Sequence, residues 1–183
     1  MGKFVKKFVV LPNHGLFLFY ILSPRYTTFM TTVSGNLIPT PLLQSPSFQL
    51  ERVRRRTRDK VEAALAEKKT TLREFWVLTC LVDSDAASQS FLSETLAFDA
   101  SDMVRLIDQL EDREWARRKR DPKDRRRQIV TSTKKGSKAY KELAELVTKA
   151  EDEALYDSTS KQLKHLRKLA KAIIAADAEE DDS

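Results

Sequence analysis

From residue 45 onward, apolar and polar residues alternate with the period of a helix that buries one face. In such helices, apolar side chains recur every three or four residues. This spacing holds in segments that begin near Ser45, Thr71, Ser88, Asp99, Thr133 and Thr159 or Ser160. Each beginning offers a Ser, Thr or Asp side chain that can accept a hydrogen bond from the first helical turn. Glu74 stands three residues after Thr71 and completes the pattern of a capping box.

Two extended runs interrupt this helical pattern. They are Trp115–Arg120 and Arg125–Thr131, with residues 121–124 (Asp-Pro-Lys-Asp) between them. Asp followed by Pro favours a type I turn, so the three segments predict a β-hairpin. The two short helices before it, which start at Ser88 and Asp99, are joined by a tight turn and predict a helix-turn-helix. The pattern therefore predicts a mainly α fold with one small β-hairpin.

Residues 1–45 follow a different pattern. A basic start and the apolar run Leu16–Leu22 are typical of a signal peptide, but residues 12–15 (Pro-Asn-His-Gly) interrupt the segment and no Ala-x-Ala site follows. The run is also too short to span a bilayer as a helix. We therefore expect a disordered extension or a misplaced start, with Met30 as a possible natural first residue. At the other end, residues 177–183 form an acidic tail.

The net charge of the 183-residue chain is +6, and one short segment accounts for the whole surplus. Residues 117–127 contain eight Lys or Arg and two Asp. A local basic cluster attracts polyanions even when the net charge is modest. A second basic run, Arg52–Lys60, is as compatible with a solvated helix face as with phosphate contacts.

The chain has few residues that carry enzymatic or metal chemistry. Its cysteine is Cys80, and its two histidines are His14 and His165. A single cysteine excludes an intramolecular disulfide and a thiolate metal cage, and it favours the reducing cytoplasm. We find no catalytic set and no metal-ligand set, so we expect a binding protein without a cofactor and not an enzyme. Cys80 lies among apolar residues and is interpreted as a buried structural thiol.

The region around the hairpin resembles one family closely. The stretches that carry the resemblance are Leu106–Arg113, Arg117–Pro122, Asp124–Arg127, Val130-Thr131 and Lys134–Gly136. Their order and residues are similar to the MarR family of bacterial winged-helix regulators, and the similarity covers about residues 50–175. Family members usually carry Gly where this chain has Ala97 and Glu114. We therefore expect local strain at these two turns.

The resemblance implies a homodimeric, cytoplasmic transcription regulator, more often a repressor, that binds double-stranded DNA and not a membrane. A small aromatic or other organic effector would change its DNA affinity. Residues 46–68 and 133–176 would form a helical dimerisation region, and residues 69–132 a winged helix-turn-helix lobe. The long amphipathic helices also expose more apolar surface than one lobe can cover, which favours a dimer over packing within a monomer. Two-fold symmetry predicts a pseudo-palindromic operator with half-sites roughly 10 base pairs apart.

Two other functions stay open. A nonspecific, nucleoid-type protein would bind any duplex with similar affinity. A winged-helix protein-interaction module would bind no DNA, and its wing would lack arginine. The arginine-rich hairpin therefore disfavours the second of these.

The helix-turn-helix predicts which residues contact DNA. The apolar residues of its second helix face inward, so the outward-facing residues are Ser101, Asp102, Arg105 and Gln109. Arg105 is the first choice for base reading, because arginine can bond guanine O6 and N7 together. Asp102 is interpreted as a helix cap in preference to a cytosine contact. Phosphate contacts are expected at the start of the preceding helix, from Ser88, Gln89 and Ser90.

The hairpin and the first helices supply the other candidates. The family's Asp-x-Arg pattern falls on Asp124 and Arg126, which in relatives tie the hairpin together or reach the minor groove. Arg125 or Arg126 is expected to enter the minor groove, and Arg120, Lys123 and Arg127 are expected to contact phosphates. Trp115 is interpreted as a core anchor, since double-stranded DNA offers no free base face. The resemblance also implies a ligand pocket lined by Arg56, Arg73, Phe75 and Trp76.

Overall fold

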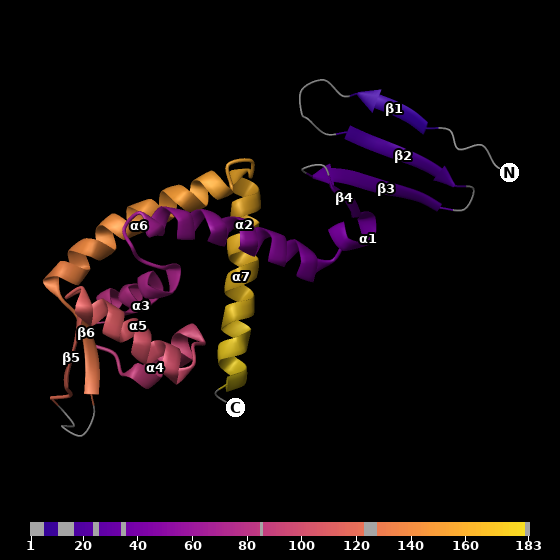
Figure 1. Ribbon diagram of the computed structural model, residues 1–183. Helices are drawn as coiled ribbons and strands as arrows, with labels where there is room; N and C mark the ends of the chain where they lie inside the picture. Colours follow the sequence, from indigo (N-terminus) through magenta and orange to yellow (C-terminus); the bar gives the residue numbers. More distant parts are fainter. Residues whose placement is uncertain are drawn as a thin grey trace. The chain divides into compact units, whose positions relative to one another are not determined.

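The computed structural model describes residues 6–10, 17–23, 26–33, 36–84, 86–122 and 128–181. The chain divides into two compact units, Met1–Arg56 and Thr57–Ser183, whose elements are labelled in Figure 1. Among the described residues, none of the helices combines the length and the apolar composition that a membrane span requires.

The first unit contains a four-stranded antiparallel sheet. Its strands pair in the order β1 (Lys6–Val10), β2 (Phe17–Ser23), β3 (Tyr26–Val33) and β4 (Asn36–Pro39), and the short helix α1 (Thr40–Leu43) follows. Met30 lies inside β3, opposite Phe19 of β2. The sheet differs from the disordered extension expected from the sequence. Aromatic and β-branched residues are frequent in these strands and favour extended backbone, a signal that the nearby prolines and polar residues obscure.

The remaining helices begin close to their expected positions. They are α2 (Pro46–Ala66), α3 (Leu72–Asp83), α4 (Gln89–Leu96), α5 (Ala100–Asp112), α6 (Lys134–Ala154) and α7 (Ser160–Asp181). The hairpin consists of β5 (Ala116–Arg120) and β6 (Gln128–Ser132), which pair antiparallel. The fold of this part of the chain is therefore mainly helical with a two-stranded wing, as predicted.

The expected N-caps are present in the structure. The Thr71 hydroxyl accepts a hydrogen bond from the Glu74 N–H at 3.2 Å, and the Glu74 carboxylate accepts one from the Thr71 N–H at 2.7 Å. This is the predicted capping box at the start of α3. Ser88, Asp99 and Thr133 each accept a hydrogen bond from the N–H group three residues further on. Local side-chain chemistry thus fixes where α3, α4, α5 and α6 begin.

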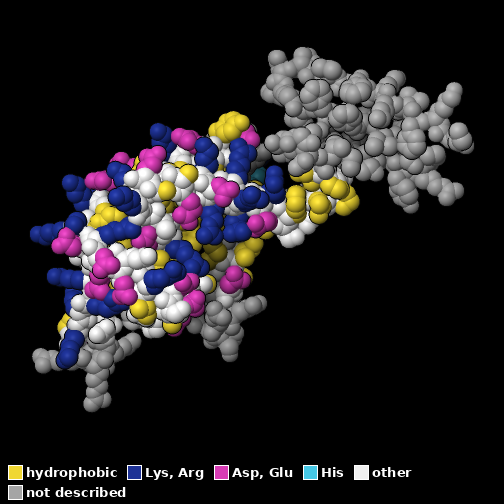
Figure 2. Space-filling view, viewed as in Figure 1, with side chains coloured by type: hydrophobic (Ala, Val, Ile, Leu, Met, Phe, Trp, Pro, Cys, Tyr) yellow, Lys and Arg dark blue, Asp and Glu magenta, His cyan; other side chains and the backbone are white. Residues whose placement is uncertain are grey.

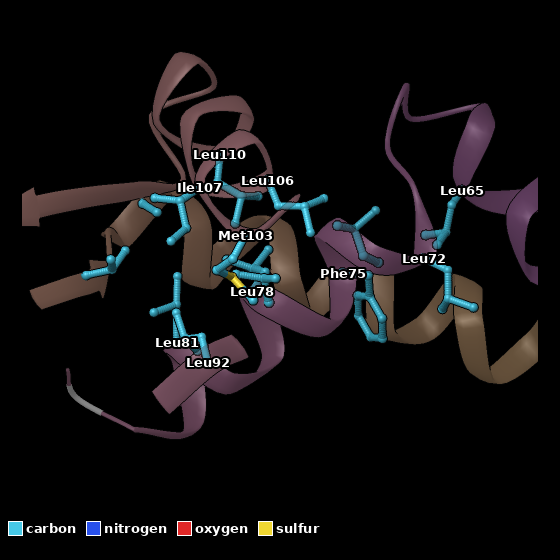
Figure 3. Packing of buried hydrophobic residues seen from close by; sticks show 14 of the residues in the cluster. Leu65, Leu72, Phe75, Leu78, Leu81, Leu92, Met103, Leu106, Ile107 and Leu110 are labelled. Carbon is cyan, nitrogen blue, oxygen red and sulfur yellow. The ribbon is translucent and has the colours of Figure 1, made fainter. Parts of the chain in front are cut away.

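One apolar core joins the helix-turn-helix to the wing. Figure 3 shows side chains from α3, α4 and α5 pointing toward one another, with Leu78, Leu81, Leu92, Met103 and Ile107 among them. These five side chains are almost completely buried, and each such burial stabilises the fold by about 1.5–3 kcal/mol. Because α4 and α5 pack on α3 through this core, their exposed faces are held in fixed positions.

The base of the wing is attached to the helix-turn-helix by backbone hydrogen bonds. Ala87, which precedes α4, and Val130 of β6 exchange two hydrogen bonds with N···O distances of 3.0 and 2.8 Å. Ala116, at the start of β5, is buried as well. Trp115 packs half-buried against the core, which agrees with its interpretation as an anchor. The wing therefore projects from a rigid base.

Two turns adopt the left-handed backbone conformation without a glycine, at the positions where strain is expected. Ala97, the C-cap of α4, has φ 51° and ψ 45°. Glu114, just after α5, has φ 60°. Lys69, in the connection between α2 and α3, also has a positive φ of 54°, which the sequence does not indicate.

Replacing Ala97 by glycine should raise the free energy of unfolding by about 0.5–1 kcal/mol. A Cβ atom in the left-handed region costs roughly 1–2 kcal/mol, and this gain exceeds the extra entropy that glycine gives the unfolded chain. Denaturant unfolding of the two proteins measures the difference. Ala139→Gly is the matched control, because Ala139 lies in regular α6 and should lose about 1 kcal/mol. A loss at both positions would contradict the strain assigned to Ala97.

Cys80 lies on α3, half-buried against the core. Burial raises the pKa of its thiol, and the Asp83 carboxylate raises it further. A thiol with a raised pKa is mostly protonated at neutral pH and reacts slowly. These properties agree with a structural role.

Candidate nucleic-acid interface

The start of α4 carries the three residues expected to contact phosphates. Ser88 is the N-cap, and its hydroxyl oxygen lies 3.1 Å from the Phe91 N–H nitrogen and 3.1 Å from the Ser90 hydroxyl. Gln89 is half-buried and Ser90 is exposed. The N–H groups of a first helical turn, together with nearby hydroxyls, suit a phosphate oxygen. The three residues thus form one polar surface at the helix start.

Helix α5 has one buried and one exposed face. The buried residues are Met103, Leu106, Ile107 and Leu110, and Ser101, Arg105 and Gln109 are exposed as predicted. Val104 is also exposed, at 40%. It is absent from the sequence-predicted set, although its helical spacing from Ser101 could have identified it. A valine at this place offers methyl groups of the kind that contact the methyl group of thymine.

Asp99 organises the first turn of α5. Its Oδ1 accepts hydrogen bonds from the Ser101 hydroxyl at 2.6 Å and from the Asp102 N–H at 2.9 Å. These hydrogen bonds, first of all the one from Ser101, lower the pKa of Asp99. The cap is therefore ionised at neutral pH, and the Ser101 proton is directed toward it.

Asp102 has a different role from the helix cap that the sequence suggests. The carboxylate that caps α5 belongs to Asp99. The two Asp102 oxygens instead bond two arginines: Oδ2 lies 2.6 Å from Arg73 Nη1, and Oδ1 lies 2.6 Å from Arg105 Nη2. Asp102 thus links α3 to the exposed face of α5, a contact between residues 29 positions apart.

Of the four residues expected to line a ligand pocket, Arg73 and Trp76 lie on the same aromatic ring. The Arg73 guanidinium lies 4.5 Å from the centre of the Phe98 ring, and the Trp76 ring stacks on the same ring with 6.2 Å between centroids. Phe75 is buried and stacks on Tyr140 of α6 with 5.8 Å between ring centroids. Arg56 belongs to the first unit. The structure therefore brings together Arg73 and Trp76, beside the turn between α4 and α5.

Three grooves lie along α6, away from Arg73 and Trp76. Their volumes are about 700, 440 and 270 Å³, and residues of α2, α6, α7 and the α6–α7 connection line them. None of the four expected pocket residues lines these grooves. Within the described part of the chain, no group of His, Cys, Asp or Glu side chains could hold a metal ion.

Arg118 fastens the wing to the exposed side of α5. Its Nη1 lies 2.6 Å from Asp108 Oδ1 and also pairs with Glu111. The Arg118 backbone N–H donates to the same Glu111 carboxylate. Although Arg118 belongs to the basic run, these contacts neutralise its charge and direct its side chain inward. Arg118 therefore holds the wing against α5 and adds little positive charge to the interface.

The other basic residues of β5 remain exposed. Arg117 and Arg120 are exposed and Lys119 lies between them, which fits the phosphate contact expected of Arg120 and adds two residues that the sequence does not single out. Lys123, Arg125, Arg126 and Arg127, with Asp124, lie outside the described residues. Figure 2 shows Lys and Arg side chains interspersed with acidic ones over the face in view.

Comparison with known proteins identifies the fold. The MarR family model matches residues 70–127, from the end of the α2–α3 connection into the wing. No curated protein matches the sequence.

Several solved structures match more than two thirds of this chain. CouR from Rhodococcus jostii, bound to p-coumaroyl-CoA, is 25% identical with a TM-score of 0.66, and the match covers 72% of this chain and 93% of that chain. A cysteine-to-serine variant of MarR from E. coli, complexed with operator DNA, is 21% identical with a TM-score of 0.64, covering 73% and 94%. BpsR from Bordetella bronchiseptica, whose DNA binding is regulated by 6-hydroxynicotinic acid, is 22% identical with a TM-score of 0.65, covering 71% and 93%.

The family match and the fold agree with the resemblance seen in the sequence. The matched residues contain the helix-turn-helix, the first wing strand and the whole arginine-rich segment 117–127. Residues 70–127 thus match the MarR family model, and the chain has the fold of solved MarR-family transcriptional regulators.

Proposed function

We propose that the protein is a homodimeric repressor that binds a pseudo-palindromic DNA operator through α5 and the wing. The observation that carries this proposal is the exposed face of α5, where Arg105 and Val104 lie beside each other in the sequence and both reach solvent. Arginine and an apolar side chain can read guanine and thymine in the major groove. The exposed basic residues of β5 would contact phosphates on either side. The operator-bound E. coli MarR variant of similar fold supports the same mode of binding.

The dimer is supported by apolar side chains that the chain leaves exposed. Helix α7 has no buried residue in its described part, and its Leu169, Ile173 and Ile174 are 54%, 49% and 68% exposed. Leu50 and Val53 of α2 are also exposed. Exposed large apolar side chains, on a helix whose described residues are not buried, are typical of an interaction site. We assign residues 46–68 and 133–176 to a dimerisation region and residues 69–132 to the DNA-binding lobe.

The proposal includes an organic effector that releases the DNA. A ligand that favours a lobe spacing unsuited to successive major grooves lowers the affinity for DNA, and DNA lowers the affinity for the ligand by the same factor. CouR bound to p-coumaroyl-CoA and the regulation of BpsR by 6-hydroxynicotinic acid support an aromatic acid or its CoA thioester as the class of effector. The exposed Trp76 and the neighbouring Arg73 offer a ring and a positive charge to such a ligand.

A binding titration tests the proposed function. The purified protein, with its mass checked by light scattering, is titrated against its own upstream intergenic DNA and against a random duplex at several salt concentrations. We expect a dimer that prefers the upstream duplex by about 1,000-fold or more. Equal and steeply salt-dependent binding to both duplexes would instead indicate a nucleoid-type protein. Binding to neither would favour a protein-interaction module.

Replacing Arg105 by alanine should weaken binding to the preferred duplex by roughly 1–3 kcal/mol, because a bidentate contact to guanine is lost. Binding to the random duplex should change little. The same titration measures both affinities, with Lys141→Ala on the exposed side of α6 as a control that removes an equal charge. An equal loss on the two duplexes would refute base reading by Arg105.

A further inference from the structure

Three charged side chains form a continuous chain from α3 to the exposed face of α5. Helices α3 and α5 pack side by side (Figure 1). Arg73 of α3 bonds one oxygen of Asp102, and Arg105 of α5 bonds the other, each at 2.6 Å. The exposed fractions of the Arg73, Asp102 and Arg105 side chains are 40%, 25% and 64%. Exposure therefore increases from Asp102 outward to the candidate base-reading residue.

The inner part of this chain is fixed by several contacts. The Asp102 N–H donates to the Asp99 cap, which holds the first turn of α5 in place. Arg73 lies over the Phe98 ring, and Phe98 stacks on Trp76. An arginine held by a ring on one side and a carboxylate on the other has few conformations left. Asp102 is therefore presented to Arg105 in one orientation.

This arrangement has consequences for a base-reading arginine. A free arginine side chain loses considerable conformational entropy when it is fixed against a base. A guanidinium has five N–H donors, and the contact with Asp102 occupies Nη2 at one edge, so other donors can still reach guanine O6 and N7. Asp102 thus restricts Arg105 before DNA arrives without consuming its capacity for hydrogen bonds.

The acidic residues of α5 explain why Asp102 needs Arg73 as a second cation. Helix α5 contains four acidic residues, and Arg105 is its one basic residue. An acidic side chain near the DNA surface repels phosphates unless a cation neutralises it. Arg73 supplies a second positive charge to Asp102, so the group Arg73–Asp102–Arg105 carries a net charge of +1 where Asp102 and Arg105 alone would be neutral.

We propose that Asp102 and Arg73 are positioning residues that hold Arg105 in the conformation that reads guanine. This inference rests on the proposed function, because it needs a duplex that the protein prefers. Asp102 orients Arg105 directly, and Arg73 acts through Asp102. The alternative is that the ion pairs serve only to attach α3 to α5, in which case they would affect stability and not base discrimination.

The test compares binding to two forms of one duplex. The first is the upstream intergenic DNA, and the second is the same duplex with 7-deazaguanine in place of guanine, which removes the N7 acceptor. The ratio of the two affinities reports the guanine contact and does not depend on the folded fraction of a variant. Wild-type protein should prefer the guanine duplex, and Arg105→Ala should bring the ratio close to one.

Asp102→Asn should lower this ratio about three- to tenfold, the cost of ordering one long side chain. Arg73→Met should lower it similarly, and Arg73→Lys, which keeps the positive charge, should recover part of it. In the Arg105→Ala background, Asp102→Asn should leave the ratio unchanged. Asp112→Asn is the matched control, because it removes an equal charge from the exposed side of α5 away from Arg105.

Two results would overturn the inference. One is an unchanged ratio in Asp102→Asn and Arg73→Met, with any affinity change equal on both duplexes, which would leave the ion pairs a purely structural role. The other is a wild-type ratio of one in a protein that still prefers its upstream DNA to a random duplex, since Arg105 would then not read guanine. A wild-type protein without any preference for upstream DNA would instead remove the proposed function itself.

Discussion

Replacing Gly136 by alanine is expected to lower the free energy of unfolding by about 3 kcal/mol or more, as overpacking against rigid atoms does. Gly136 lies in the first turn of α6, where a Cβ atom would stand 2.0 Å from the Trp115 carbonyl oxygen and 2.8 Å from its carbon. Both neighbours are backbone atoms. The same carbonyl accepts a hydrogen bond from the Thr133 N–H at 3.0 Å, so the start of α6 cannot move away without breaking this hydrogen bond.

The sign of the stability change in Gly136→Ala distinguishes the effect of packing from that of helix propensity. In a helix interior without such a contact, glycine-to-alanine stabilises by about 1 kcal/mol. Denaturant unfolding measures the change, and Lys141→Ala, at an exposed position of α6, should stay within about 0.5 kcal/mol of the parent protein. A Gly136→Ala protein as stable as the parent would show that α6 does not approach Trp115 this closely.

Replacing Arg113 by alanine should also cost about 3–5 kcal/mol, because it leaves a buried carboxylate without its cation. Glu74 is 2% exposed, and its Oε1 lies 3.1 Å from Arg113 Nη2. Oε1 accepts no hydrogen bond from the described residues. The positive charge of Arg113 therefore compensates the buried negative charge of the Glu74 carboxylate. Arg113 also donates to the Thr70 hydroxyl at 2.7 Å and to the Lys69 carbonyl, and it lies over the Trp115 ring.

The role of charge in this loss can be tested by a second substitution. In the Arg113→Ala background, Glu74→Gln removes the uncompensated charge and should recover part of the stability, whereas Glu74→Gln alone should destabilise the parent. Unfolding by urea gives all four free energies. Arg117→Ala, at an exposed arginine of β5, is the control and should have little effect. A loss below about 1 kcal/mol in Arg113→Ala would mean that the pair is solvated.

The parts of the fold that depend on local chemistry could be predicted from the sequence. The N-caps at Thr71, Ser88, Asp99 and Thr133 involve residues three positions apart, so their signals lie within one helical turn. The strained turns at Ala97 and Glu114 follow from the family resemblance, since the glycine that suits a left-handed backbone is absent there. The exposed position of Arg105 follows from helical periodicity alone.

The features that depend on contacts between residues distant in the sequence could not be predicted. Sequence spacing shows Asp102 only within its own helix and so favours a cap, whereas its partner Arg73 lies on α3. Arg118 counts with the basic run in the sequence, although Asp108 and Glu111 of α5 neutralise it. In both cases the basic residue pairs with acids from another element, and a count of local charge does not reveal such pairs.

Selection of bound sequences from a pool of random duplexes tests the central claim most directly, because it assumes no particular operator sequence. We expect the wild-type protein to enrich an inverted repeat with half-site centres roughly 10 base pairs apart. Each half-site should contain a guanine that is no longer enriched by Arg105→Ala protein. A pool that stays random after selection, or one enriched only in a single asymmetric site, would contradict the account of a dimer that reads DNA through α5.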